Sequence, residues 1–143
     1  MDKIRNEIVQ INPEFWNKFS KYLDDSDSVY NDDSIAIQLY FIFELLKFML
    51  NDANNILKDK CNNHLNILNM LCVYSLIMRE FNNIMCNLVD LNESKKIEFD
   101  SISIEFIEIF DIFNHFLDDN LDQKITESNE RIDKLYLKII RLI

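Results

Sequence analysis

The chain contains no glycine, and this absence constrains its fold more than any other feature of its 143 residues. Glycine adopts positive φ angles at little cost, and primed hairpin turns, Walker loops and dinucleotide-binding loops all depend on it. The chain therefore lacks the one residue type that all of these motifs require. With one proline and 48% hydrophobic residues, the sequence predicts a mostly helical globular protein.

The net charge is strongly acidic and unevenly placed. Fifteen Lys and Arg residues stand against 25 Asp and Glu residues, which gives −10. Residues 124–143 hold five basic and three acidic side chains, so their net charge is +2 and that of residues 1–123 is −12. An acidic surface repels phosphate backbones, so nucleic acid is not an expected partner. The acidic stretches 24–33 and 105–122 leave open a mimic of duplex nucleic acid, although acidic surfaces commonly serve solubility.

Cysteine content and apolar runs indicate the compartment. The three cysteines have no framework spacing, and residues 1–10 lack the apolar stretch of a signal peptide. The longest apolar runs, 35–43 and 67–78, are shorter than the roughly 20 residues that span a bilayer. We therefore expect a cytoplasmic protein without a stable membrane anchor. Eighteen Asn and 21 Ile beside two Ala indicate an AT-rich genome, as in many large DNA viruses, phages and low-GC bacteria.

The N-terminal half predicts two helices separated by a loop. Asn12-Pro13 is a typical helix start, with Asn as the N-cap and Pro at the first helical position, and it predicts a helix over 13–24. Short polar and acidic residues then predict a solvated loop over 24–33. Apolar residues next recur every three or four positions, which predicts a long helix over 34–60 with a break near 51–55.

The next predicted helix, 64–91, is the most apolar. Its middle, 67–78, has apolar residues on all sides, and such a helix must be covered on all sides. We therefore expect it to be the central, buried helix, with burial ending where polar residues return at Arg79. Cys72 and Cys86 lie fourteen residues apart, nearly four turns, so they share one face and are expected to be buried as small hydrophobic residues.

The C-terminal third predicts two more helices. Residues 97–104 alternate with period two, which leaves a short strand open, but the helical spacing that follows favours a helix over 101–122. Thr126 or Ser128 is the expected cap of a last helix that ends at Ile143. Because this helix mixes basic and apolar residues, we expect its apolar stripe to pack on the body of the protein. The alternative is a helix that lies on a membrane surface.

No internal repeat and no Pro-, Gly- or Ser-rich linker divides the chain. The sequence therefore predicts an all-α fold, in which residues 1–143 form a single-domain bundle of five to six helices. The bundle surrounds the central apolar helix.

Residues that could carry chemistry are few. The two histidines, His64 and His115, do not follow Glu at the spacing of di-iron bundles. Cys61 and His64 have the spacing of metal ligands, but no second pair completes a zinc site. No base is indicated for a catalytic cysteine, and the carboxylates follow a solvated surface pattern. The sequence therefore predicts a non-enzymatic protein with no catalytic residue, no cofactor and no metal ion.

Two stretches of the chain resemble a known family. Residues 67–74, followed by 79–81, are similar to the central helix of the poxviral Bcl-2-like proteins, and residues 106–120 are similar to the helix that follows it. Residues 38–40 add a weaker similarity. The chain departs from the family in lacking the Gly and Trp that members often place near the end of the central helix, where Phe81 stands.

The resemblance implies a viral protein that binds host signalling or pro-apoptotic proteins in the host cytoplasm. It would inhibit apoptosis or innate inflammatory signalling through nuclear factor kappa B, and one branch of the family often forms homodimers. Phe41, Phe43 and Phe48 exceed what one apolar stripe needs, and with Phe81 they are the candidate partner-binding residues, unless they pack in the core. The alternative function is a homodimeric or regulatory helical bundle of a phage or low-GC bacterium, unrelated to Bcl-2.

Overall fold

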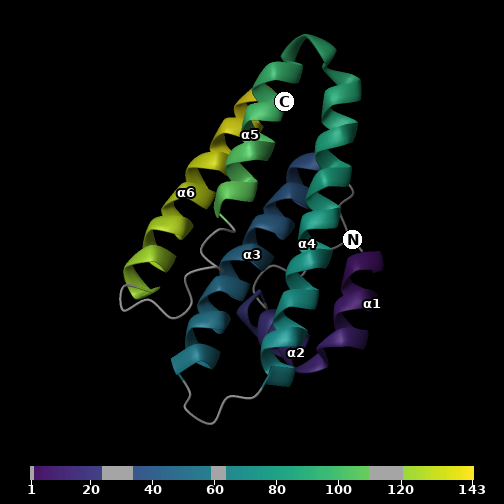
Figure 1. Cartoon of the computed structure of the whole chain (residues 1–143). Helices are drawn as coiled ribbons and strands as arrows, with labels where there is room; N and C mark the ends of the chain where they lie inside the picture. The colour runs from purple at the N-terminus through teal and green to yellow at the C-terminus, as the bar shows by residue number, and fades with distance from the viewer. Residues whose placement is uncertain (1, 24–33, 59–63, 110–120) are drawn as a thin grey trace. The chain divides into compact units, whose positions relative to one another are not determined.

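A computed structural model of the chain describes residues 2–23, 34–58, 64–109 and 121–143. Every secondary-structure element within these ranges is helical (Figure 1), which confirms the predicted all-α class for this part of the chain. The elements are α1 (Asp2–Ile11), α2 (Pro13–Tyr22), α3 (Ile35–Lys58), α4 (His64–Leu91), the 3-10 turn η2 (Glu93–Lys95), α5 (Lys96–Ile109) and α6 (Leu121–Leu142).

The chain forms two compact units. The N-terminal unit is Met1–Phe81 and the C-terminal unit is Asn82–Ile143, so α4 contributes residues to both. Each unit is described separately below. The prediction that residues 1–143 form a single domain stays a prediction.

The first helix begins earlier than predicted. The chain was expected to start its helices at Pro13, but α1 already occupies Asp2–Ile11. Ile4 and Ile8 are fully buried and lie one turn apart, so a short, mostly polar segment still has an apolar stripe to pack. The predicted start of α2 is confirmed, because the side chain of Asn12 accepts a hydrogen bond of 3.0 Å from the backbone N–H of Phe15.

Aromatic side chains hold α2 against α3. The ring of Phe19 is fully buried and lies 5.7 Å from Phe41 and 5.6 Å from Phe48, both on α3. It also lies 5.6 Å from Trp16 and 6.3 Å from Phe15 on its own helix. The two pairs with α3 are edge-to-face, the pair with Trp16 is tilted and the pair with Phe15 is stacked. Phe19 is therefore the centre of the aromatic core between α2 and α3.

Helix α3, rather than α4, has the longest run of buried residues in the described chain. It continues through positions 51–55, where a break was predicted. Between Leu39 and Leu50, most side chains of α3 are buried: Leu39, Phe41, Ile42, Phe43, Leu45, Leu46, Met49 and Leu50. Apolar residues at these positions surround more than one side of the helix, which accounts for its burial.

The bounds of α4 match the prediction, but its burial does not. Within the segment 67–78, which was expected to be covered on all sides, Leu71 is 37% exposed, and Cys72 and Ser75 are exposed as well. Burial also continues beyond Arg79 to Leu88 instead of ending there. Hydrophobicity on all sides of a helix shows that each side can be buried, but tertiary packing decides which side is covered.

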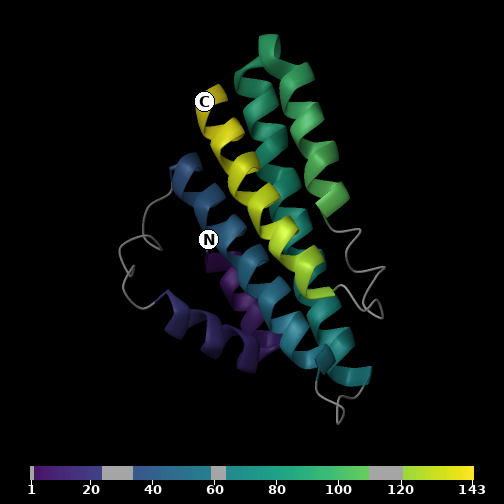
Figure 2. The same cartoon turned by 90° about the vertical axis from the view of Figure 1, so that its left-hand side faces the viewer.

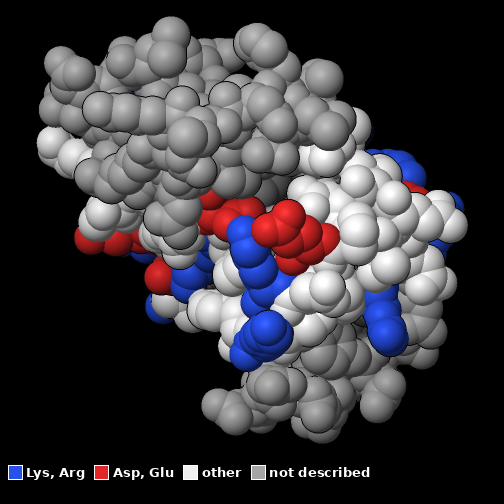
Figure 3. All heavy atoms as spheres, turned by 90° about the horizontal axis from the view of Figure 1, so that it is seen from below, with Lys and Arg blue, Asp and Glu red and all other residues white. Residues whose placement is uncertain are grey.

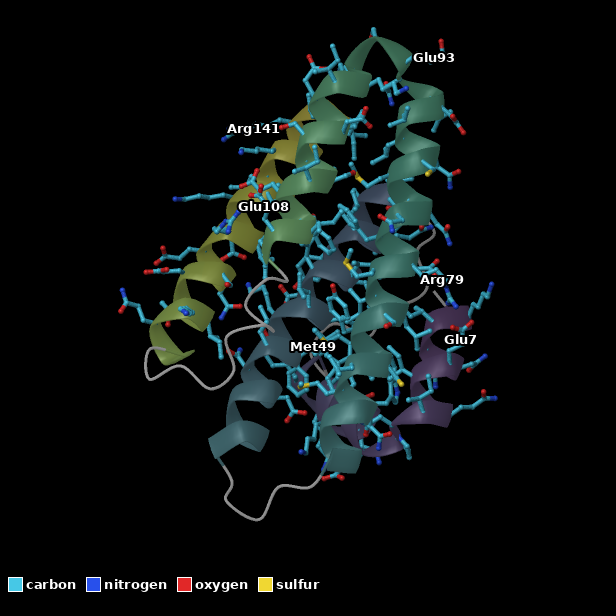
Figure 4. The ribbon with its side chains drawn as sticks, in the orientation of Figure 1. Glu7, Met49, Arg79, Glu93, Glu108 and Arg141 are labelled. Atoms are coloured by element: carbon cyan, nitrogen blue, oxygen red, sulfur yellow. The ribbon has the colours of Figure 1, made fainter. Side chains whose placement is uncertain are left out.

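Ion pairs join the helices of the N-terminal unit at its surface. The guanidinium group of Arg79 on α4 binds the carboxylate of Glu7 on α1, and both side chains are partly buried (Figure 4). Lys18 on α2 lies 3.5 Å from Asp52 on α3. These pairs hold α1 to α4 and α2 to α3, in addition to the aromatic core.

The C-terminal unit begins its helices earlier than predicted. Helix α5 starts at Lys96 instead of 101, so the strand left open for residues 97–104 does not form. Helix α6 starts at Leu121, which places Thr126 and Ser128 inside the helix and corrects their assignment as caps. Several predicted features lie outside the described residues: the loop over 24–33, the turn with Cys61, the continuation of the 101–122 helix, and His115.

Helices α5 and α6 pack side by side in opposite directions. Lys95, at the start of α5, donates a 2.7 Å hydrogen bond to the carbonyl oxygen of Leu142, at the end of α6. Figures 1 and 2 both show the two helices alongside each other. Each buries one apolar stripe: Phe99, Ile102, Phe106 and Ile109 on α5, and Ile125, Ile132, Leu135 and Ile139 on α6.

Replacing Phe19 tests the centre of the N-terminal unit. We expect Phe19→Ala to lower the free energy of unfolding by about 3–5 kcal/mol, because it removes a fully buried ring with five aromatic neighbours. Urea denaturation followed by circular dichroism measures the change. Asn17→Ala, at an exposed position of the same helix, serves as the control and should change stability by less than about 0.5 kcal/mol. Equal, small effects of both variants would contradict this account.

Candidate functional site

Helix α5 is apolar on two opposite sides. Ile97, Ile104 and Ile107 are 82%, 60% and 53% exposed. At about 100° per residue, Ile97 and Ile104 point in directions that differ by only about 20°, and they lie opposite the buried ring of Phe106. The helix therefore buries one apolar stripe and presents a second one to solvent.

Helix α6 adds a fourth apolar side chain to this surface. Leu137 is 51% exposed and lies opposite the buried stripe that includes Leu135 and Ile139. Its sequence neighbour Lys138 pairs with Glu105, the neighbour of Ile104, at 3.1 Å. In an antiparallel pair this register puts Leu137 and Ile104 on the same side and at the same level to within about one turn. We call the surface formed by Ile97, Ile104, Ile107 and Leu137 the outer face.

Two ion pairs fix the register of α5 against α6. Lys138 lies 3.1 Å from Glu105, and Arg131 lies 3.3 Å from Glu108 (Figure 4 labels Glu108). Acidic and basic side chains also lie next to one another on the face of the protein seen from below (Figure 3). Basic side chains of α6 thus contact carboxylates of α5, in addition to being exposed to water.

The apolar stripe of α6 is buried, as predicted for a last helix that packs on the body of the protein. A helix that lies on a membrane surface would need this stripe free for lipid. Among the described helices, none combines the length and the hydropathy needed to cross a membrane.

Charges of both signs surround the outer face. On α5 the exposed residues beside the isoleucines include Asp100, Glu108 and Lys96. On α6 the exposed residues within two turns of Leu137 include Lys134, Arg141, Asp133 and Glu130. Neither Asp100 nor Arg141 forms an ion pair with another described residue.

The phenylalanines predicted as partner-binding residues lie elsewhere. Phe41, Phe43 and Phe81 are buried, and Phe43 packs edge-to-face on Phe81 at 6.0 Å. Phe48 is partly buried, with its ring 5.5 Å from that of Phe15 and 5.4 Å from that of Tyr22. In this structure a partner could reach the three buried rings only after the helices moved apart.

The outer face was not predicted from the sequence, although a signal for it exists. Residues 97–104 place apolar side chains at two kinds of spacing, and the period-two part of this pattern left a short strand open beside the preferred helix. In a helix, the same pattern means that Ile97 and Ile104 cannot share the face of Phe99 and Ile102. Apolar residues beyond one helical stripe were the available signal.

The two described cysteines correct another expectation. Cys72 and Cys86 were expected to be buried, but both are exposed free thiols. They share one face of α4, as predicted, and this is the face opposite Val73 and Ile77, which are buried. Other residues cover α4 on one side only, so Cys72 and Cys86 are exposed for the same reason as Leu71.

No cluster of three or more His, Cys, Asp or Glu residues suited to a metal ion occurs in the part of the chain that the structure describes. Cys61 lies outside that part, and the side chain of His64 is not described.

Two tyrosines have shifted acidity in the N-terminal unit. The pKa of Tyr22 is raised above 10.0, first by partial burial of the ring against Phe19 and Phe48, and then by the negative charge of Glu44. The hydroxyl of Tyr22 donates a 3.1 Å hydrogen bond to Glu44 Oε2. Burial alone raises the pKa of Tyr74.

Comparison with protein-family models, with curated proteins and with solved structures finds no match for the chain. The functional assignment therefore depends on the geometry of the described residues.

The raised pKa of Tyr22 predicts a pH dependence of stability. Because the folded chain holds this proton more tightly than the unfolded chain, the free energy of unfolding should fall as pH rises above 10.0. Urea denaturation from neutral pH to about pH 11 should show a shallower fall for Tyr22→Phe than for the wild type. Glu44→Gln keeps an acceptor but removes the charge, so its fall should be intermediate. A Tyr22→Phe profile that parallels the wild type would contradict the shift.

The α5–α6 contact should depend on its apolar stripe far more than on its ion pairs. Lys138→Ala removes a partly exposed pair and is expected to cost less than about 1 kcal/mol. Ile139→Ala, at the next position, removes a fully buried side chain and is expected to cost about 2–5 kcal/mol. Chemical denaturation of both variants measures the difference. A larger loss for Lys138→Ala than for Ile139→Ala would disprove this order.

Proposed function

We propose that the chain is a non-enzymatic binding protein that captures a helix of a partner protein on the outer face. The observation that carries this proposal is the second apolar stripe of α5, where Ile97, Ile104 and Ile107 are exposed on the side opposite the buried stripe. Exposed apolar side chains that gather on one surface, with polar side chains around them, are typical of sites of protein interaction.

Energetics favour a partner for this surface. Covering apolar area stabilises a complex by about 25 cal/mol per Å², and three isoleucines and one leucine that are at least half exposed offer such area together. Because the ion pairs at Glu105 and Glu108 fix α5 against α6, the four side chains are held in place before a partner arrives. Binding therefore loses little conformational entropy on this side of the interface.

The shape of the outer face suits an amphipathic helix. Such a helix places apolar anchors at i, i+3, i+4 and i+7 and lays them between the ridges of the receiving surface. Here α5 and α6 lie side by side, with Ile104 and Leu137 exposed at the same level on the two helices and the Glu105–Lys138 pair between them. The exposed charges around this face, among them Asp100 on α5 and Lys134 on α6, would favour a partner helix whose own charges are opposite in sign to those that they meet.

The resemblance to poxviral Bcl-2-like proteins makes this proposal more specific. It supports a viral protein that acts in the host cytoplasm and captures a helix of a pro-apoptotic or inflammatory signalling protein. The all-α architecture supports the same assignment. In this more specific proposal, capture of the host helix inhibits apoptosis or signalling to nuclear factor kappa B.

Calorimetric titration with a panel of pro-apoptotic amphipathic helical peptides tests the proposal. We expect at least one peptide to bind with micromolar or tighter affinity and with a negative heat-capacity change, because apolar area is buried. Ile104→Asp should weaken that binding at least tenfold, since it puts a charge at the centre of the outer face.

The control carries the same added charge away from this surface. Asn17→Asp lies at an exposed position of α2 in the N-terminal unit and should leave peptide binding unchanged. If no peptide of the panel binds, this result contradicts the proposed capture of such helices. Binding that Ile104→Asp does not weaken would place the site elsewhere and contradict the role of the outer face.

A further inference from the structure

We propose that Asp100 determines which helix the outer face accepts, and that the accepted helix has Lys or Arg between two apolar residues that stand seven positions apart. This inference rests on the proposed function, because it names the chemistry of the partner for the same surface. It follows from the position of one carboxylate among the exposed isoleucines of α5, and from the cost of removing that carboxylate from water.

Asp100 lies within the row of exposed isoleucines. Ile97, Asp100, Ile104 and Ile107 follow one another at steps of three, four and three residues, and all four side chains are exposed. These steps are the spacing at which helices contact each other in a coiled coil. At about 100° per residue, Asp100 points within about 60° of Ile97 and within about 40° of Ile104. A helix that covers both isoleucines therefore covers Asp100 as well.

The carboxylate of Asp100 differs from its acidic neighbours on α5 in having no cation beside it. Glu105 lies 3.1 Å from Lys138 of α6. Glu108 lies 3.3 Å from Arg131 of the same helix. Asp100 forms no ion pair with another described residue. A cation that a partner brings to this position can therefore pair with Asp100 without breaking a contact inside the chain.

Lys96 is the basic residue nearest to Asp100 along α5, and it does not take this role. It is exposed, lies one turn before Asp100 and forms no ion pair with it in the described chain. A basic residue four positions before an acidic one is in the less favourable order for pairing along a helix. Lys96 also points about 80° away from Ile104, so it lies at the edge of the row and keeps its water when the row is covered.

The cost of burying an unpaired charge makes the position of Asp100 selective. A partner that covers Ile97 and Ile104 also displaces water from the carboxylate between them. Without a new partner for the carboxylate this loss weakens the complex, whereas Lys or Arg opposite it supplies a charge-assisted hydrogen bond. Glu at the same place would bring two carboxylates into contact. The partner helix thus has its basic residue three or four positions after the first apolar residue, depending on its direction.

Asp100 also fixes where along α5 the partner binds. Ile97 and Ile104 are one heptad apart, so a wholly apolar row would let a helix bind at more than one level. A single polar residue in such a row sets the register, because every shifted position leaves it without its partner. The same carboxylate therefore selects both the partner and its register.

Calorimetric titration of the full chain with designed amphipathic helical peptides tests this role. The peptides share two leucines seven positions apart and differ in one residue between them, which is Arg, Ala or Glu and stands three or four positions after the first leucine. The wild type should bind the better Arg peptide at least tenfold more tightly than the matching Ala peptide, and the Glu peptide least tightly. Asp100→Lys should reverse the order of the Arg and Glu peptides.

Three further variants serve as controls. Asp100→Asn removes the charge at nearly constant size, so it should reduce the preference for Arg over Glu at least tenfold. Glu14→Lys makes the same change of charge as Asp100→Lys at an exposed position of α2, and Lys96→Gln removes the charge at the edge of the row. Both should keep the wild-type order. Circular dichroism checks the folding of each variant, and the reversed order in Asp100→Lys is a gain of binding that unfolding cannot produce.

The outcomes separate this inference from the proposed function. If the peptides bind and Ile104→Asp weakens them, but the Arg and Glu peptides bind equally well, the selective role of Asp100 is overturned and the proposed function stands. An order of peptides that Asp100→Lys leaves unchanged overturns the inference in the same way. If none of the peptides binds, the proposed function is contradicted, and this inference falls with it.

Discussion

Asparagine residues make two of the junctions between consecutive helices in the described part of the chain. Asn12, between α1 and α2, has φ −147° and ψ 77°, and Asn92, between α4 and η2, has φ −140° and ψ 61°. No described residue has a positive φ angle. In a chain without glycine, the left-handed conformation that often ends a helix is costly, so one extended residue ends one helix and begins the next. Side-chain hydrogen bonds of both asparagines support these junctions.

These junctions determine which faces become exposed. The turn η2 and helix α5 follow directly after Asn92, so a short connection fixes the position of α5. One stripe, centred on Phe106, is covered, and the stripe with Ile104 remains outside. Two ion pairs then hold α6 at a register that brings Leu137 beside Ile104. The outer face thus results from a connection and a register, each fixed by identifiable side chains.

Local signals in the sequence predicted some elements well. The cap at Asn12 and the proline after it fixed the start of α2, and the apolar pattern of 64–91 matched the bounds of α4. Helix α1 was missed because its stripe, with Ile4 and Ile8, is short and surrounded by polar residues. The caps expected for α6 failed because a threonine or serine also fits inside a helix, as Ser128 does.

The candidate site was harder to predict, because exposure is a property of tertiary packing. The sequence showed that α3, α4 and α5 each have more apolar residues than one stripe requires. It did not show in which of these helices the additional apolar side chains would be buried. In α3 the surplus includes Phe41 and Phe43, and it is buried, whereas in α5 it includes Ile97 and Ile104, and it is exposed. The phenylalanines were chosen because they exceed one stripe, and three of the four, Phe41, Phe43 and Phe81, are buried.

Charge adds a constraint on any partner of the outer face. A chain of net charge −10 repels a second acidic protein, and two copies of this chain repel each other overall. At physiological ionic strength the Debye length is about 8 Å, so charges far from an interface are largely screened, while pairs in contact are affected less. The segment 124–143 is net basic, and it contains most of α6. Contact pairs such as Lys138–Glu105 and Arg131–Glu108 are therefore affected less by the overall repulsion than charges that lie far apart.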